Sequence, residues 1–180
     1  IAANKLLAAM RKEDGTLRTY DEMKAEGIET KYLGRYETNT TPGLCRLDPN
    51  TGIGDPTPAF TYCLNLAEVE VDTKTGKTTV LKFTCVDFVG RIGNIDAVNG
   101  QAYSGIMHGI GFALKEDYAD VKKHANMFGA GTSYIKDVPD DINLIHIDGA
   151  ISDGPFGSSG ASEAFQASGH CAVLNGIYNA

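Results

Sequence analysis

Three features that mark whole classes of proteins are missing from this sequence of 180 residues. No run approaches the roughly 18 consecutive apolar residues of a membrane-spanning helix, so we expect no segment to cross a bilayer. Basic residues are in deficit, because 16 Lys and Arg stand against 23 Asp and Glu, a formal charge of −7. This acidic balance leaves no basic stripe to neutralise phosphates, which argues against a nucleic acid or an anionic membrane as the partner.

The third missing feature is a closely spaced set of cysteines. The sequence contains no Cys-x-x-Cys pair, and its cysteines lie far apart, at Cys45, Cys63, Cys85 and Cys171. A structural zinc site or an iron–sulfur cluster built from this stretch alone is therefore not expected. The cysteines are also too few for an extracellular disulfide framework. We interpret them as reduced, small apolar side chains in a cytoplasmic protein.

Glycine is what the sequence has in excess. It takes 21 of the 180 positions, about 12% against a usual ~7%, and it clusters in residues 90–111 and 149–176. The hydrophobic content of 42% and the charged content of 22% are typical of a globular chain with one domain or two small ones. The first residue is Ile1, no signal peptide follows it, and the last residues lie in an apolar, helix-like run. We therefore interpret residues 1–180 as one segment of a longer chain, truncated at both ends.

The spacing of apolar residues predicts helices near the start of the chain and strands farther along it. Residues 1–12 carry apolar side chains at helical spacing, and a capping box that begins at Thr19 predicts a second helix ending near Gly27. Residues 34–59 are rich in Thr, Pro and Gly, which predicts an irregular connection. Two β-rich runs around the turn at residues 72–76 then predict a hairpin.

The second half predicts a glycine-rich helix, a strand and a buried helix. Residues 97–116 have small residues along one side of the helix. Because glycine costs about 1 kcal/mol per helical site against alanine, several of them indicate that another backbone or a bulky ligand lies close. Residues 142–148 predict a strand, and residues 164–180 predict a buried helix with an apolar stripe of Val173, Leu174 and Ile177. This order of elements is typical of the α+β class.

A loop rich in Gly and Ser connects that strand to the last helix and leads into Glu163, the only ionisable side chain from Gly154 to Gln166. Small residues leave backbone N–H groups open to an anion or a metal-oxo group. A poorly solvated carboxylate is a stronger base, as a general base requires, whereas a helix N-terminus favours the charged form. The residues alone leave open a second interpretation, in which Glu163 is only a dipole partner in the first turn of a helix.

The run GPFGSSGASEAFQASGHCAVLNGIYNA resembles the C-terminal active-site segment of the molybdenum hydroxylases, the xanthine oxidase and aldehyde oxidoreductase family. More narrowly, it is similar to bacterial aldehyde oxidoreductases of the molybdopterin cytosine dinucleotide type. Four other segments resemble the family in the same order, namely TYDEMKA, AEVEVDTKTGKTTV, GQAYSGIMHGIGFALKEDYADVKKHA and GAGTSYIKDVPD. The resemblance implies that residues 1–180 are the C-terminal segment of a molybdopterin-binding catalytic domain.

The resemblance also implies an oxidoreductase that converts aldehydes to carboxylic acids with oxygen taken from water. In the family, a Glu after the Gly-rich loop takes the proton from a hydroxyl group on molybdenum, and Glu163 occupies that position. Electrons leave through two 2Fe-2S clusters held outside this segment. The pterin dithiolene binds the metal, so no residue here is expected to be a metal ligand, and His108 and His170 are interpreted as packing or hydrogen-bonding residues.

Further positions match the cofactor-binding segments of the family. Gln101 matches a Gln that hydrogen-bonds the pterin, with a helix N-terminal cap as its alternative interpretation. Asn94 lies in a segment that runs along the cofactor in relatives. The loop whose backbone faces the metal ligands and the pterin corresponds to Gly157, Ser158, Ser159 and Gly160. The implied partners are a small aldehyde or heterocyclic substrate, the remainder of the enzyme and, as one arrangement, a second copy in a homodimer.

One position departs from the family pattern, since many relatives have Gly where Ser162 precedes the base. The added Cβ lies near the expected metal and puts the fine geometry of the site in question, rather than the base itself. Two alternative functions stay open: hydroxylation of a purine or another N-heterocycle by the same chemistry, and a non-catalytic α+β binding module in which Glu163 and the glycines are structural.

Overall fold

The chain forms two compact units, Ile1–Pro56 and Thr57–Ala180. The computed structural model describes residues 1–35, 47–54, 57, 59–151 and 154–180. Cys45 and much of the irregular connection predicted at residues 34–59 lie outside these ranges.

The N-terminal unit contains the two predicted helices, α1 (Ala2–Met10) and α2 (Tyr20–Ala25). The capping box at Thr19 is present. Its side-chain oxygen accepts a hydrogen bond from the Glu22 backbone N–H at 3.3 Å, and the Glu22 carboxylate accepts one from the Thr19 N–H at 2.7 Å. Gly27 follows the helix with a φ of +70°, a conformation that glycine adopts without strain. Both ends of α2 therefore form as the sequence predicts.

The C-terminal unit is built on a three-stranded sheet with the strand order β1-β2-β3. β1 (Tyr62–Val71) and β2 (Thr78–Phe88) form the predicted antiparallel hairpin. β3 (Asp141–His146) lies parallel to β2, at the other side from β1.

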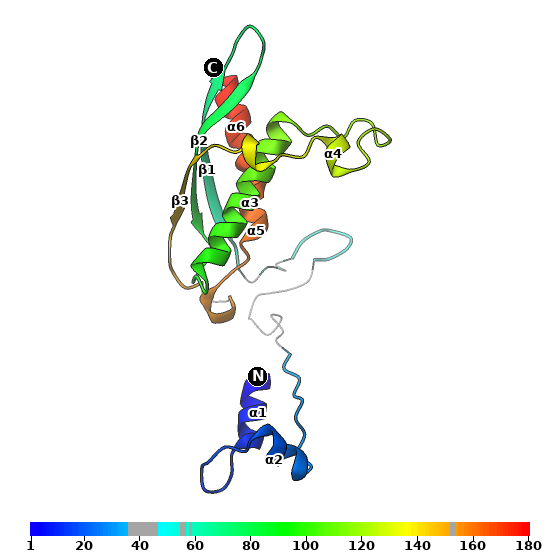
Figure 1. The fold of residues 1–180 in the computed structure, drawn as a ribbon, viewed down its shortest axis with the longest axis vertical. Helices are drawn as coiled ribbons and strands as arrows, with labels where there is room; N and C mark the ends of the chain where they lie inside the picture. Colours follow the sequence, from blue (N-terminus) through cyan, green and yellow to red (C-terminus); the bar gives the residue numbers. More distant parts are fainter. Residues whose placement is uncertain (36–46, 55–56, 58, 152–153) are drawn as a thin grey trace. The chain divides into compact units, whose positions relative to one another are not determined.

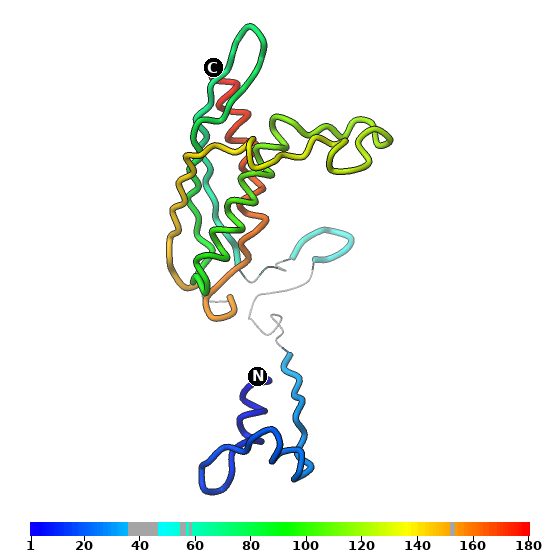
Figure 2. The backbone as a smooth tube through the Cα atoms, viewed as in Figure 1, coloured from blue at the N-terminus to red at the C-terminus, as the bar shows by residue number. Residues whose placement is uncertain are grey.

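Three helices, which include the glycine-rich helix, cover one face of this sheet (Figure 1). They are α3 (Ile95–Leu114), α5 (Ser162–Ala167) and α6 (Gly169–Tyr178). In Figure 2 the C-terminal segment runs beside the hairpin, and Gly176 lies against Val69. Short helical turns complete the unit: α4 (Met127–Ala130), η2 (Ile135–Asp137) and η3 (Pro155–Gly157). These layers confirm the predicted α+β class.

The core lies between the sheet and the three helices. Phe83 of β2, Ile106 of α3, Phe165 of α5 and Val173 of α6 are all fully buried. Burying one such side chain stabilises a fold by about 1.5–3 kcal/mol. No helix among the described residues is both long enough and apolar enough to cross a membrane.

The predicted C-terminal helix is interrupted, because α5 ends and α6 begins at Ser168. The Ser168 hydroxyl accepts a hydrogen bond from Asn65 Nδ2 at 2.8 Å. The prediction that Leu174 faces the core is wrong, since Leu174 is 47% exposed whereas Val173 is fully buried.

Two glycines of α3 bring other helices into backbone contact. A Cβ at Gly105 would lie 2.5 Å from the Phe165 Cβ, and a Cβ at Gly109 would lie 3.0 Å from the Gly169 Cα. Both separations leave no room for an unadjusted side chain. The predicted close approach to the glycine-rich helix is therefore confirmed, and the neighbour is protein backbone.

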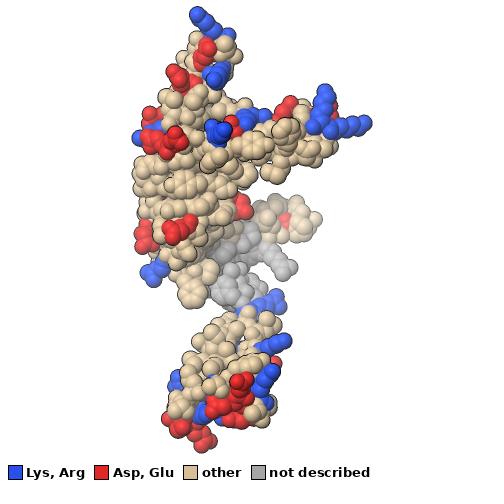
Figure 3. All heavy atoms as spheres, in the orientation of Figure 1, with Lys and Arg blue, Asp and Glu red and all other residues tan. Residues whose placement is uncertain are grey.

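Charged side chains of both signs gather at the ends of the C-terminal unit, while the middle of the face in Figure 3 carries few. Asp72 and Lys74 lie in the hairpin turn, and Asp120, Lys122 and Lys123 lie in the segment that precedes α4. Because the signs alternate, that face presents no basic stripe.

A buried polar network ties β2 and β3 to α3. Asp87 of β2 is only 1% exposed, and its Oδ2 lies 2.6 Å from His146 Nδ1 at the end of β3. The other ring nitrogen of His146 lies 2.7 Å from Asn99 Oδ1 on α3. Burial raises the pKa of Asp87, and the hydrogen bond to His146 opposes that rise. The network therefore fixes the start of α3 over the ends of two strands.

The first prediction concerns Gly105. Gly105→Ala should lower the free energy of unfolding by roughly 1–3 kcal/mol, since its Cβ would overlap Phe165. Gly100→Ala is the matched control on the same helix, because a Cβ there meets nothing within 4 Å, and it should raise stability by up to about 1 kcal/mol. Denaturant unfolding measures both. Equal effects of the two substitutions would contradict the close helix contact.

The second prediction concerns His146. His146→Ala leaves the Asp87 carboxyl buried without its partner, which should cost roughly 3–5 kcal/mol. A carboxyl whose pKa is raised by folding keeps its proton to a higher pH in the folded than in the unfolded protein. The free energy of unfolding therefore falls as pH rises through the folded-state pKa. The loss should therefore be larger at pH 8 than at pH 5. Adding Asp87→Asn should remove that pH dependence, whereas a loss independent of pH would exclude the carboxyl as its source.

Candidate functional site

Glu163 is the second residue of α5, and its side chain is exposed. It borders a hollow of about 280 Å³ that is also lined by Gly109, Phe112, Gln166, Ala167 and His170. The sequence led us to expect a poorly solvated carboxylate. Within the described residues Glu163 instead stands at the open edge of this hollow.

Gln101 lies beside the start of α5. The Ser162 hydroxyl donates a hydrogen bond to Gln101 Oε1 at 2.5 Å, across 61 residues of sequence. Gln101 therefore contacts the residue directly before Glu163. The alternative interpretation of Gln101 as a helix cap is wrong, because Asn94 is the N-cap of α3 and its Oδ1 accepts a hydrogen bond from the Ala97 backbone N–H at 3.0 Å.

The Gly/Ser loop is anchored on the segment that follows β2. The Gly157 carbonyl accepts a hydrogen bond from the Arg91 backbone N–H at 2.8 Å, and the Ser158 hydroxyl donates one to the Arg91 carbonyl at 2.5 Å. The Ser159 N–H donates to the Val89 carbonyl at 2.9 Å. Gly157 has a φ of +84°, so a side chain there would strain the backbone. These hydrogen bonds and the backbone conformation of Gly157 hold the loop against the segment that follows β2.

These contacts limit the number of backbone N–H groups in the loop that can donate a hydrogen bond to a ligand. The N–H groups of Gly157, Ser158 and Ser159 already donate to carbonyls of the chain. Within the part of the chain that the structure describes, those of Gly160 and Ala161 have no acceptor. A Cβ at Gly160 would also meet nothing within 4 Å. The open end of the loop is thus the end next to Glu163.

Thr61, directly before β1, and Asn65 of β1 bond to the chain at the two ends of α5. Ahead of the helix, the Thr61 hydroxyl donates to the Gly160 carbonyl and lies 2.6 Å from the Ser159 hydroxyl. Behind it, Asn65 Nδ2 donates to the Ser168 hydroxyl. A helix of six residues has little stability of its own, so these bonds and the packing of Phe165 determine where Glu163 lies.

The two histidines considered from the sequence have different surroundings. The His170 ring meets the Phe112 ring edge-on at a centroid distance of 5.3 Å, and its Nε2 lies 3.3 Å from Cys171 Sγ. His108 is half-buried on α3. Among the described residues, no three His, Cys, Asp or Glu side chains converge on a point where they could hold a metal ion.

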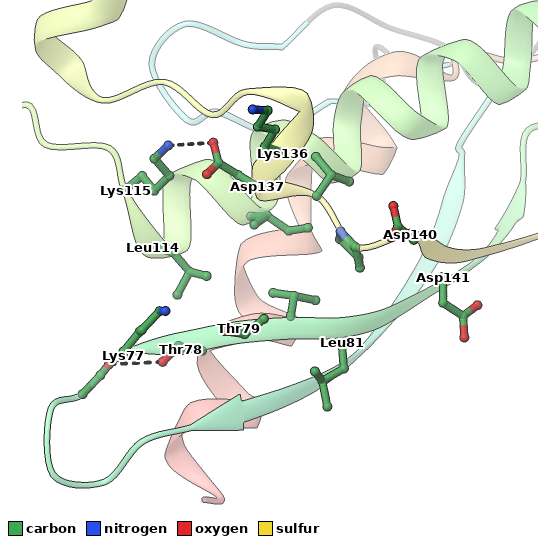
Figure 4. A pocket seen from close by; sticks show the side chains of 15 residues that line it. Lys77, Thr78, Thr79, Leu81, Leu114, Lys115, Lys136, Asp137, Asp140 and Asp141 are labelled. Atoms are coloured by element: carbon green, nitrogen blue, oxygen red, sulfur yellow. Dashed lines mark hydrogen bonds and ion pairs between the residues drawn. The ribbon is translucent and has the colours of Figure 1, made fainter.

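A larger hollow, of about 750 Å³, lies away from Glu163, where the C-terminal end of α3 meets the start of β2 (Figure 4). Lys115 and Asp137 form an ion pair across its rim at 2.6 Å. Its other polar side chains include Lys136 and Asp140. None of the predicted site residues lines it.

Sequence reasoning missed Thr61, Asn65 and the residues of the network around His146. A signal was present for two of them. Asn65 and Asp87 are polar residues at inward-facing positions of strands whose other inward-facing residues are mostly apolar, and a buried polar side chain needs a hydrogen-bond partner. Thr61 precedes its strand and follows a stretch with no regular pattern, so nothing in the sequence distinguished it.

Comparisons with a family model, with protein sequences and with solved structures agree on one family. Residues 2–139 match the molybdopterin cofactor-binding domain family. The aldehyde oxidoreductase of Megalodesulfovibrio gigas is 41% identical over all 180 residues, which correspond to 20% of its length. The solved structure of the aldehyde oxidoreductase of Desulfovibrio desulfuricans ATCC 27774 superposes on the whole chain with a TM-score of 0.85 at 44% identity, over 19% of its length.

A probable hypoxanthine oxidase of Escherichia coli K12 is 30% identical over 129 residues, which are 69% of this chain and 14% of that protein. The chain thus spans about a fifth of the length of the aldehyde oxidoreductases that it matches, and less of this third relative. The family match includes Asn94 and Gln101, and the relative from M. gigas aligns through Glu163 as well. The chain belongs to the molybdopterin cofactor-binding domain family.

Proposed function

We propose that this chain forms one wall of the molybdenum–pterin site of an aldehyde-oxidising hydroxylase, with Glu163 as its general base. One observation carries the proposal. The Ser162–Gln101 hydrogen bond brings together two positions that the sequence associates with the cofactor, next to the unpaired amides of Gly160 and Ala161. The Gln101 side chain therefore contacts the residue directly before Glu163, and the two free N–H groups belong to the residues directly before Ser162.

The residues at this corner fit a polar, anionic cofactor. Unpaired N–H donors and the side-chain amide of Gln101 can satisfy oxygen or nitrogen acceptors of a pterin. The open space at Gly160 admits a ligand close to the backbone. From Gly154 to Gln166 the sequence has no charged side chain apart from Glu163.

The chain's own residues have separable roles in this proposal. Glu163 accepts a proton at a carboxylate oxygen, and the bonds from β1 hold α5 so that this oxygen faces the reacting group. Gln101 binds the pterin, and Ser162 orients Gln101. The bound molybdenum–pterin group supplies the two-electron oxidation, with oxygen that originates from water.

Aldehyde oxidation is favoured because the two relatives that match the entire chain are aldehyde oxidoreductases. The similarity to a probable hypoxanthine oxidase supports a purine or N-heterocycle hydroxylase as the second candidate. Steady-state assays with an aldehyde series and a purine series decide between them. No observation favours the non-catalytic module, since the family match is to a cofactor-binding domain.

The finer features belong to the same proposal. We infer a cytosine dinucleotide form of the pterin, two 2Fe-2S clusters outside these residues, a cytoplasmic enzyme and contact with the remainder of the polypeptide or its subunits. Support comes from the relatives' greater length and from the resemblance of the sequence. Metal analysis of the complete protein should find molybdenum and iron together, and neither metal would be present in a binding module.

The third prediction tests the base. Glu163→Gln keeps the size of the side chain and removes its ability to accept a proton, so turnover should fall by about 10²–10⁴-fold. Molybdenum content should stay near that of the unmodified protein, because the amides and Gln101 are untouched. Steady-state kinetics and elemental analysis on the same samples measure the two quantities.

Glu70→Gln is the matched control, since Glu70 is exposed near the far end of β1. It should change neither turnover nor metal content. Full turnover in the Glu163 variant would remove this residue from the mechanism while leaving cofactor binding intact.

The fourth prediction tests Gln101. Gln101→Ala should lower the molybdenum and pterin bound per protein, because a hydrogen bond to the pterin is lost. Ser162→Ala should lower both less, since Gln101 stays but loses its 2.5 Å contact. Ser104→Ala, an exposed site on the same helix, is the control. Unchanged cofactor content in the Gln101 variant would show that this side chain does not bind the pterin.

A further inference from the structure

Two thiols face each other across the hairpin, beneath the helices. Cys63 of β1 and Cys85 of β2 point to the covered face of the sheet, and their Sγ atoms are 3.4 Å apart. In the strand register Asn65 is opposite Cys85 and Cys63 is opposite Asp87, so the two cysteines form a diagonal cross-strand pair. Both are free thiols.

The distance between the sulfur atoms is short enough for bond formation. A disulfide has an S–S length of about 2.05 Å, so the sulfur atoms need to approach by roughly 1.4 Å. Side-chain rotation and a small shift of strands that are already hydrogen-bonded can supply that approach. The right-handed twist of a sheet shortens one of its two diagonals, which favours such a pair.

The two thiols are unequal, as a reactive pair requires. Cys63 is half-buried and Cys85 is fully buried, so a small oxidant meets Cys63 first. The hydrogen bond from Cys85 lowers the pKa of Cys63, which increases its thiolate fraction and hence its nucleophilicity. The same contact and burial raise the pKa of Cys85, which stays a thiol.

We propose that Cys63 and Cys85 are an oxidation site at which a peroxide forms a reversible cross-strand disulfide. The Cys63 thiolate attacks one peroxide oxygen, the O–O bond breaks, and sulfur gives up two electrons to form a sulfenic acid. The Cys85 sulfur then attacks the Cys63 sulfur, the S–O bond breaks, and water leaves with the Cys85 proton. Overall, two thiols and one peroxide become one disulfide and two waters.

The position of the pair gives this modification a consequence for the fold. Cys63 lies between Thr61 and Asn65, the two residues that bond to the chain on either side of α5. A bond that pulls Cys63 toward β2 therefore acts on the support of the helix that carries Glu163. The inference goes beyond the proposed function, because the disulfide forms whether or not Glu163 is a base.

The fifth prediction tests this proposal by detecting a covalent bond between the two cysteines, without a measurement of activity. The complete purified protein is treated with hydrogen peroxide, denatured, alkylated and digested with trypsin. Cleavage after Lys and Arg puts Cys63 on the peptide of residues 47–74 and Cys85 on that of residues 83–91, while Cys171 lies beyond Lys136. Mass spectrometry should find the first two peptides joined, two hydrogens lighter than their sum, and separated again by dithiothreitol.

Matched variants make the result specific. Cys63→Ser should abolish the joined peptide, and Cys171→Ser should leave its yield unchanged. In Cys85→Ala the sulfenic acid on Cys63 has no partner, so its labelling by dimedone should increase. If that core variant fails to fold, the two serine variants still decide the outcome.

Exposed Cys171 reports that the oxidant was effective. Alkylation of both Cys63 and Cys85 in samples where Cys171 is oxidised would overturn the proposal. Oxidation of Cys63 to a sulfinic acid with Cys85 still free would overturn it as well, because it would show that the second thiol does not reach the first.

Discussion

The close contact of α3 with α5 and α6 is the constraint on which the candidate site depends. Gly105 admits Phe165 and Gly109 admits Gly169, so the helices approach to a distance that any larger side chain would prevent. This contact places the first turns of α3 beside the first turn of α5. The hydrogen bond between Gln101 and Ser162 is possible only at that separation. The entropy that glycine costs in a helix is therefore offset by the packing that it permits.

A second constraint comes from the sheet. α5 is too short to hold its own position, and Thr61, directly before β1, and Asn65 of β1 bond to the chain on either side of it. The sheet itself is fixed against α3 by the Asp87–His146–Asn99 network, in which both nitrogens of one ring are bonded. The position of α5, and with it the backbone of Glu163, is thus set by strands and helices.

The sequence predicts the secondary structure of this chain well, because its signals are local. The capping box at Thr19 and the hairpin turn are determined by neighbouring residues. The break at Ser168 was not predicted, and the side chain that bonds to Ser168, that of Asn65, lies 103 residues away, beyond any local pattern. At the site, resemblance named Glu163 and Gln101, but the Ser162–Gln101 bond depends on tertiary packing that no spacing rule contains. The departure from the family pattern at Ser162 thereby acquires a physical role: its hydroxyl fixes the orientation of Gln101.

Exposure of Glu163 bears on how a base of this kind could work. A carboxylate in water gains little from its position, because solvent screens it and competes for its hydrogen bonds. Within the described residues it borders a hollow that is also lined by Phe112 and His170. The chain corresponds to 20% of the length of its relative from M. gigas. Under the proposed function, this edge is covered by the cofactor and by the rest of a protein of similar length. Exclusion of water at assembly would then remove the solvent that screens the carboxylate, and the fold of this chain contributes the fixed side of that closure.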